Sequence, residues 1–119
     1  MNTQSFLKSV MGSVDAKDAE KFVTHLTDDA TFRFANMEPV KGKENVKQAV
    51  AGFFGSIKGL NHKLLDTVEQ NGTIVMRGEV TYTRHDNSKL TVPFVNFFKM
   101  NGKKIKDYLI YVDASQLYA

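Results

Sequence analysis

The sequence predicts an α+β fold in which helices pack on one face of a curved sheet. Apolar residues in the first half of the chain recur at three- and four-residue spacing, which is typical of amphipathic helices. Residues 73–113 instead alternate apolar and polar side chains around two short turns, which is typical of consecutive antiparallel strands. Within the most apolar of these strands stands one amide, Asn96, and most functional expectations depend on it.

Two helices are expected before the first strand. The first covers residues 4–14, and Thr3 or Ser5 is available as its N-cap. The second follows Asp15, a candidate cap, and is expected to end at the polar residues 27–29, which turn into a strand rather than forming a catalytic carboxylate pair. The apolar stripe of the second helix consists of Ala19, Phe22, Val23 and Leu26.

The middle of the chain is expected to supply a strand, a helix and another strand. Residues 30–34 alternate as a short strand, and residues 36–42 form a loop. Residues 43–57 have one apolar stripe and predict the third helix. A strand over residues 60–68 is then closed by the turn former Asn71-Gly72.

The last three strands are expected to form a meander over residues 73–83, 89–100 and 104–112. A three-residue loop of residues 85–87 sets Arg84 opposite Ser88, so that even-numbered residues of the two strands share one face. That face is apolar and therefore buried. On the middle strand it carries Leu90, Val92, Phe94, Asn96 and Phe98.

The register of the last strand has two solutions. The preferred one turns Tyr108 and Ile110 inward, because that face is the more apolar. A two-residue Asn101-Gly102 turn favours the other solution. In that case the inward residues are Asp107, Leu109, Tyr111 and Asp113.

Composition excludes several classes of function. A chain of 119 residues is expected to form one domain, residues 1–119. With no cysteine and three scattered histidines, we expect neither a metal site nor a cofactor. The start of the chain has no leader-like segment, and no stretch approaches the ~20 apolar residues of a membrane span, so a cytoplasmic protein without membrane contact is expected. The net charge of +3 is spread over the chain, which does not favour nucleic acid as a partner.

Four short motifs carry a resemblance to a known family. They are Leu26–Phe32, Val40–Lys43, Gly102–Ile105 and Tyr111–Asp113. Their order and spacing resemble the SnoaL-like polyketide cyclase family of the nuclear transport factor 2-like superfamily, over residues 5–117. The resemblance implies a cone-shaped, cystatin-like α+β fold with three helices on the concave face of a curved sheet that is mixed or antiparallel. It also implies a pocket between sheet and helices and a homodimer joined through the sheet. It does not imply one reaction.

The ketosteroid isomerases of this superfamily allow a residue-by-residue comparison. Their oxyanion-hole aspartate corresponds to Asn96, which can still donate a hydrogen bond to a developing oxyanion. Their catalytic base corresponds to Phe34 and their tyrosine to Val10, neither of which can exchange a proton. The resemblance therefore implies a site with a polar anchor but without that family's base.

A base would have to come from elsewhere. His25, next to the apolar stripe of the second helix, either faces the pocket as an acid or base or lies at its boundary in solvent. His62 is placed at the pocket rim or the sheet edge, and His85 on the surface. Arg84 either pairs with a ligand carboxylate at the pocket mouth or is a solvated strand end.

The predicted site thus has a polar part and an apolar part. Its catalytic candidates are Asn96, His25 and Tyr108. Its ligand-binding candidates are Phe34, Phe54, Met76, Tyr82, Phe94, Phe98 and Ile110. The first hypothesis is a protein that binds a small hydrophobic molecule without its own reaction. The alternative is an isomerase, cyclase or dehydratase that uses acid-base chemistry beside a carbonyl, with Asn96 as oxyanion donor.

Overall fold

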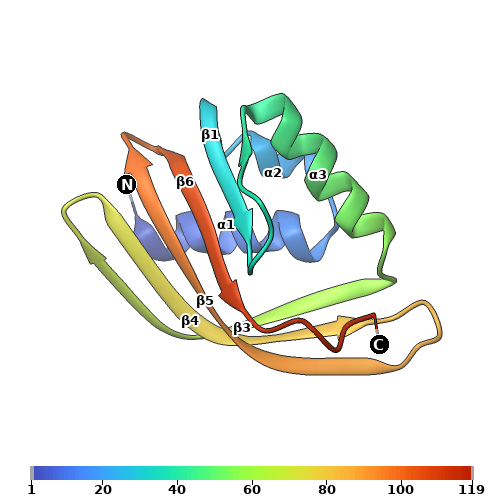
Figure 1. The fold of residues 1–119 in the computed structure, drawn as a ribbon. Coiled ribbons are helices and arrows are strands. Elements are labelled where there is room, and N and C mark those ends of the chain that lie inside the picture. Colours follow the sequence, from blue (N-terminus) through green and yellow to red (C-terminus); the bar gives the residue numbers. More distant parts are fainter. Residues whose placement is uncertain (1, 119) are drawn as a thin grey trace.

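The computed structural model describes residues 2–118, which form three helices and a six-stranded sheet. The helices are α1 (Thr3–Asp15), α2 (Ala19–Val23) and α3 (Lys43–Gly55). The strands are β1 (Leu26–Phe34), β2 (Val40–Lys41), β3 (Gly59–Gln70), β4 (Thr73–Thr83), β5 (Lys89–Asn101) and β6 (Lys104–Val112). The sheet is strongly bent, and the helices lie on its concave side (Figure 1). The predicted α+β class is confirmed.

The strands follow the order β2-β1-β6-β5-β4-β3 across the sheet. Strands β3 to β6 are consecutive antiparallel neighbours, while β1 pairs with β6 in parallel. Because β1 and β6 lie far apart in the sequence, the parallel pair closes the first half of the chain onto the meander (Figure 1). The sheet is therefore mixed and open.

Several predicted boundaries near the N-terminus were wrong. The N-caps are Asn2, which accepts from the Ser5 N–H, and Asp18, which accepts from the Lys21 N–H. Strand β1 begins at Leu26, opposite Ile105 of β6, so residues 27–29 lie in the strand and not at a helix end. Leu26 stands four residues after Phe22, a helical spacing, and its strand partner is too distant in sequence to be seen locally.

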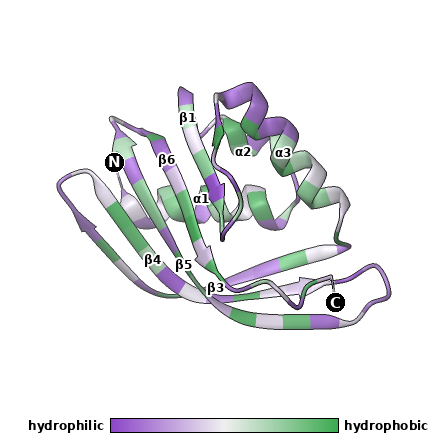
Figure 2. Cartoon of the chain, in the orientation of Figure 1, coloured by the Kyte–Doolittle hydropathy of each residue, from purple (hydrophilic) through white to green (hydrophobic). Residues whose placement is uncertain are grey.

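The hairpin between β4 and β5 has the predicted register. The Arg84 N–H donates to the Ser88 carbonyl across a loop of residues 85–87, with an N···O distance of 2.8 Å. Even-numbered residues therefore pair with each other, as Ile74 does with Phe98. Figure 2 shows the resulting alternation of hydrophobic and hydrophilic residues along these strands.

A β-bulge sets the inward face of β6. Asn101 pairs with Lys104 around a two-residue turn, which by itself would bring odd-numbered residues inward. The register shifts by one residue between Ile105 and Asp107, and beyond this bulge Tyr108 lies opposite Phe98. The preferred Tyr108 face is confirmed, because the tyrosine is 2% exposed.

Strands β3 and β4 approach each other closely at Gly78. Strand β3 carries a second register shift between Leu64 and Asp66, next to Gly78 of β4. A Cβ atom on Gly78 would lie 2.0 Å from the Lys63 carbonyl oxygen, so the backbone of β3 occupies the space of a side chain. Only glycine permits this approach.

The main core lies between the concave face of the sheet and the helices. Helix α1 contributes Leu7 and Val10, and helix α3 contributes Val46, all with 0% exposure. They pack in one cluster with sheet residues such as Ile74 and Ile105. None of the helices within residues 2–118 is long and apolar enough to cross a membrane.

Candidate functional site

A cavity of about 340 Å³ lies among the sheet, α3 and the loop after β1. Most of its wall is apolar and much of it aromatic. The lining residues are Val14, Phe22, Phe32, Phe34, Met37, Glu38, Val40, Ala49, Val50, Gly52, Phe53, Phe54, Ser56, Leu60, His62, Val80, Tyr82, Phe94, Asn96, Tyr108, Ile110 and Tyr118. Such an apolar hollow with few polar groups is typical of a small-molecule site.

The structure brings most of the predicted lining residues to this cavity. Those in the wall are Phe34, Phe54, Tyr82, Phe94 and Ile110. Met76 and Phe98 do not reach the wall and are fully buried in the core. The Phe98 ring packs against the Tyr108 ring, with centroids 4.3 Å apart. Tyr108 therefore covers the Phe98 ring, which was expected to contact a ligand. A position on the same inward face as Asn96 is therefore not sufficient to bring a side chain into the cavity wall.

Asn96 is the most unusual group in the wall. Its side chain is 1% exposed, and Oδ1 has no hydrogen-bond partner among residues 2–118. A buried polar atom without a partner costs about 1–3 kcal/mol, so such atoms are rare in folded proteins. The amide can accept through Oδ1 or donate through Nδ2, and no partner fixes its orientation. It can therefore satisfy either kind of group on a bound molecule.

Tyr108 carries a second polar group that has no strong hydrogen-bond partner among the described residues. Its hydroxyl donates only to the Met11 Sδ, a weak acceptor, at 3.9 Å. Burial raises the pKa of the Tyr108 phenol well above its usual range, and the Asp15 carboxylate adds to this effect. The hydroxyl consequently remains a protonated donor. Tyr82, at another part of the wall, behaves similarly, because burial raises its pKa to about 12.

His62 lines the cavity and is held by Asp15, the last residue of α1. The His62 Nδ1 lies 2.6 Å from the Asp15 Oδ1, and the His62 backbone N–H donates to the Asp15 Oδ2 at 3.1 Å. The side chains are 10% and 24% exposed. Sequence reasoning placed His62 at the pocket rim or the sheet edge and considered Asp15 as a cap for the following helix. The alternation of Leu60, His62 and Leu64 was a signal for an inward histidine, but nothing local indicated its partner.

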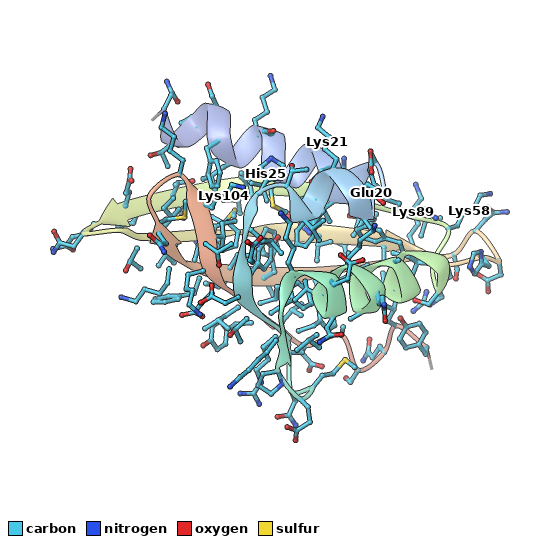
Figure 3. The ribbon with its side chains drawn as sticks, turned by 90° about the horizontal axis from the view of Figure 1, so that it is seen from above. Glu20, Lys21, His25, Lys58, Lys89 and Lys104 are labelled. Atoms are coloured by element: carbon cyan, nitrogen blue, oxygen red, sulfur yellow. The ribbon has the colours of Figure 1, made fainter. Side chains whose placement is uncertain are left out.

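His25 does not line the cavity, so the expectation that it faces the pocket was wrong. Helix α2 ends at Val23, and His25 lies beside α1 just before β1 (Figure 3). Its Nδ1 lies 3.1 Å from the Phe22 carbonyl and its Nε2 lies 3.0 Å from the Ser9 Oγ. Burial lowers its pKa, although the Phe22 carbonyl acts in the opposite direction. These contacts tie α1 to the end of α2.

Arg84 binds the C-terminal segment and does not line the cavity. Its Nε donates to the Leu117 carbonyl at 2.8 Å and its Nη2 to the Gln116 carbonyl at 2.9 Å. The neighbouring Tyr118 lines the cavity, and its hydroxyl lies 2.7 Å from the Ser56 Oγ of the wall. Arg84 therefore fixes one side of the mouth instead of meeting a ligand itself.

Other charged candidates lie outside the wall. Asp107 and Asp113 do not line the cavity, and Asp113 binds the backbone N–H of Ser115. Asp28 and Asp29 form long ion pairs with lysines, at 3.9 and 3.8 Å. Within residues 2–118, no cluster of three or more acidic or histidine side chains could hold a metal ion.

Comparison with known proteins gives one family and one fold. The family model of the SnoaL-like domain matches residues 8–108. Proteins with a curated function include no match to the sequence.

Solved structures with the same fold have little sequence in common with the chain. A nuclear transport factor 2-like protein of unknown function from Burkholderia pseudomallei K96243 is 13% identical, with a TM-score of 0.87 over 98% of this chain and 95% of that one. TerC, co-crystallised with polyporic acid, is 15% identical, with a TM-score of 0.82 over 97% and 94%. An epoxide hydrolase of the LEH-like type from M. tuberculosis is 10% identical, with a TM-score of 0.80 over 96% and 84%.

These structures establish the fold, and the domain match covers most of the sequence. The chain is a member of the SnoaL-like family, with the fold of the nuclear transport factor 2-like proteins.

Proposed function

We propose that the protein binds a small, mostly apolar molecule in this cavity and anchors it through Asn96. The observation that carries the proposal is the buried Asn96 Oδ1, which lacks a hydrogen-bond partner among residues 2–118 and lies in the wall of an otherwise apolar hollow. A bound hydroxyl or amine would supply the missing partner. The same amide, turned over, would donate to a carbonyl.

The shape of the wall supports a flat or aromatic ligand. The rings of Phe34 and Phe53 lie 5.3 Å apart, and Phe53 meets Tyr82 edge to face at 6.1 Å. Aromatic walls of this kind bind ring systems by stacking and edge contacts. TerC, which has the same fold, was co-crystallised with polyporic acid, and this supports an organic small molecule as the ligand class.

The direct test is a ligand screen by thermal shift on the wild-type chain and on Asn96→Leu. We expect the best ligand to raise the Tm of the wild type and to lose most of this effect on the variant. Asn61→Leu is the matched control, because Asn61 is exposed on β3 and does not line the cavity. Equal stabilisation of the wild type and Asn96→Leu would show that Asn96 is not in the site.

A second candidate function is an enzyme that moves a proton beside a carbonyl, of the isomerase, cyclase or dehydratase type. One observation favours it: His62, whose imidazole is a possible proton acceptor, lines the same cavity as Asn96. A cavity lined only by groups that cannot accept a proton would have excluded this function.

We also propose that the protein forms a homodimer through the outer face of the sheet. Tyr111, on the outer face of β6, is 59% exposed, and Val95 and Phe97 of β5 lie partly exposed on the same side. Apolar side chains of this kind favour a sheet-to-sheet contact. Light scattering after size exclusion should give twice the monomer mass for the wild type and a smaller mass for Tyr111→Glu. A monomeric wild type would contradict the proposal.

A further inference from the structure

We propose that the Tyr118 side chain is a movable partition between the cavity and a side pocket next to it, and that the ligand carries a neutral, hydroxylated tail that enters the side pocket. The inference rests on the proposed function, because the ring system of this ligand occupies the same cavity. It adds a second binding site and the chemical class of the group that fills it.

The side pocket is a separate hollow of about 250 Å³ whose wall includes Arg84, His85 and Asp86. Ser56 and Tyr118 line both the side pocket and the cavity. The Tyr118 hydroxyl lies 2.7 Å from the Ser56 Oγ. A hydrogen bond between two side chains therefore stands at the boundary between the two spaces.

The Tyr118 side chain can rotate while the backbone before it stays in place. Tyr118 is 67% exposed, and its bond to the exposed Ser56 can be replaced by bonds to water at little cost. Exposed side chains change rotamer within picoseconds to nanoseconds. In contrast, Arg84 holds the carbonyls of Gln116 and Leu117, and the Leu117 side chain is 1% exposed. Rotation of one tyrosine would therefore connect the cavity to the side pocket.

The wall of the side pocket carries charges of both signs. Each nitrogen of the Arg84 guanidinium donates one hydrogen bond, so two of its five N–H groups have no acceptor within residues 2–118. The Asp86 Oδ1 accepts from the N–H and the hydroxyl of Ser88, and these bonds hold the pKa of the Asp86 carboxyl below its ordinary value. The side pocket is therefore lined by a cation with spare donors and by a carboxylate.

His85 adds a neutral acceptor to this wall. Its Nε2 lies 3.0 Å from the Gly55 carbonyl, which can only accept. Nε2 therefore carries the proton of the neutral ring, and Nδ1 keeps its lone pair. The side pocket thus combines donors and acceptors, whereas most of the cavity wall is apolar.

This combination favours a neutral group that both donates and accepts. A carboxylate on the tail would meet the like charge of Asp86, and an ammonium group would meet that of Arg84. A hydroxyl carries no charge and can donate as well as accept. An alkyl tail would displace water from these polar groups without replacing its hydrogen bonds. We therefore expect a ligand with an apolar ring system at one end and a hydroxylated tail at the other.

The test compares three ligands with one ring system. 2-Naphthol reaches only the cavity, 6-(2-hydroxyethoxy)-2-naphthol adds a hydroxylated tail, and 6-propoxy-2-naphthol adds an alkyl tail of the same length. In each ligand the naphthol hydroxyl is the partner for the Asn96 amide. Fluorescence titration of the wild type should give a Kd about fivefold lower for the hydroxylated tail than for the alkyl tail. Equal Kd values for the two tailed ligands would overturn the proposal.

The charge of the side pocket is tested with Asp86→Asn, which keeps the shape of the side chain. 6-(Carboxymethoxy)-2-naphthol has an anionic tail and should bind to this variant about three- to tenfold more tightly than to the wild type. Asp28→Asn is the matched control, because Asp28 is exposed and lines neither space. Thermal unfolding checks that both variants are folded. The same gain on both variants would mean that net charge is responsible, and would place the tail outside the side pocket.

The partition is tested by ¹⁹F NMR on the chain labelled with 3-fluorotyrosine, which has four tyrosines. Tyr118→Phe identifies the Tyr118 resonance, and Tyr111 is the internal reference because it lines neither space. The hydroxylated ligand should move the Tyr118 resonance in the same direction as Ser56→Ala, which removes the bond at the boundary. A Tyr118 resonance that stays in place when this ligand is bound would overturn its role as a partition.

The outcomes separate this inference from the proposed function. If 2-naphthol binds to the wild type and the hydroxylated tail gives no advantage over the alkyl tail, the side pocket is not part of the site and the binding function stands. If none of the naphthols binds, the binding function fails for hydroxylated ring systems, and the inference about the side pocket fails with it.

Discussion

The rings of His62 and Phe94 meet edge to face, with centroids 5.1 Å apart, although strand β4 lies between the strands that carry them. The residue of β4 opposite Phe94 is Gly78, which has no side chain, whereas the residue opposite His62 is Val80. His62 therefore reaches Phe94 diagonally across β4, on the side where glycine leaves space.

Replacing Gly78 by alanine should destabilise the protein strongly. The new Cβ would lie 2.0 Å from the Lys63 carbonyl oxygen, which is backbone and cannot move without displacing β3. We expect a loss of about 3 kcal/mol or more in the free energy of unfolding, measured with urea. Gly12→Ala is the matched control: it sits in α1 with no atom within 4 Å of the new Cβ, and should stabilise by about 0.5–1 kcal/mol. Similar effects of the two substitutions would contradict this account of the close approach between β3 and β4.

Asn96→Leu should make the unliganded protein more stable while abolishing its anchor. Leucine has a similar size and removes a buried oxygen that has no partner among the described residues. The free energy of unfolding should rise by about 1 kcal/mol, because the cost of burying the unpaired group disappears. Chemical unfolding without ligand gives the answer. A less stable variant would mean that the amide is paired in solution.

Arg84→Met should loosen the C-terminal segment. It removes two charge-assisted hydrogen bonds to the carbonyls of Gln116 and Leu117, and Leu117 is 1% exposed. We expect faster amide exchange in residues 115–118 and a loss of about 1–3 kcal/mol in the free energy of unfolding. Arg77→Met is the control, because its ion pair with Asp66 joins side chains that are 59% and 60% exposed, and such pairs contribute less than about 1 kcal/mol. Equal effects would argue against a structural role for Arg84.

His25 should make the protein less stable in mild acid. Burial lowers its folded-state pKa below the ordinary 6.5, so the unfolded chain binds more protons as the pH falls through this value. The free energy of unfolding must then decrease below about pH 6.5. His25→Gln should reduce this decrease when urea unfolding is compared on both sides of that pH. An unchanged pH dependence would show that another group is responsible.

The sequence predicted those features whose determinants lie close together in the chain. The register of the β4–β5 hairpin depends on the loop of residues 85–87 and on alternation within the two strands, and all of this is visible locally. The direction of Asn96 followed from the same alternation. The inward face of β6 was predicted correctly from its apolar character. The bulge at Lys106 makes this face compatible with a two-residue turn, but nothing in the neighbouring sequence indicates the bulge.

The errors share one physical cause, which is that their determinants are distant in sequence. The start of β1 depends on pairing with Ile105, and local spacing assigned Leu26 to a helix instead. The orientation of the His62 ring depends on its contact with Asp15, which lies 47 residues away. Because α2 ends at Val23, the spacing between Phe22 and His25 does not place the histidine on a helix facing the cavity.

The close approach of β3 and β4 at Gly78 involves two main-chain segments, Gly78 and Lys63, that do not line the hollow. Substitutions such as Phe34→Leu, Gly52→Ala or Val80→Thr would change the outline of the hollow while leaving the path of the backbone intact. The cavity can therefore be redesigned for ligands of different shape by substituting wall residues alone.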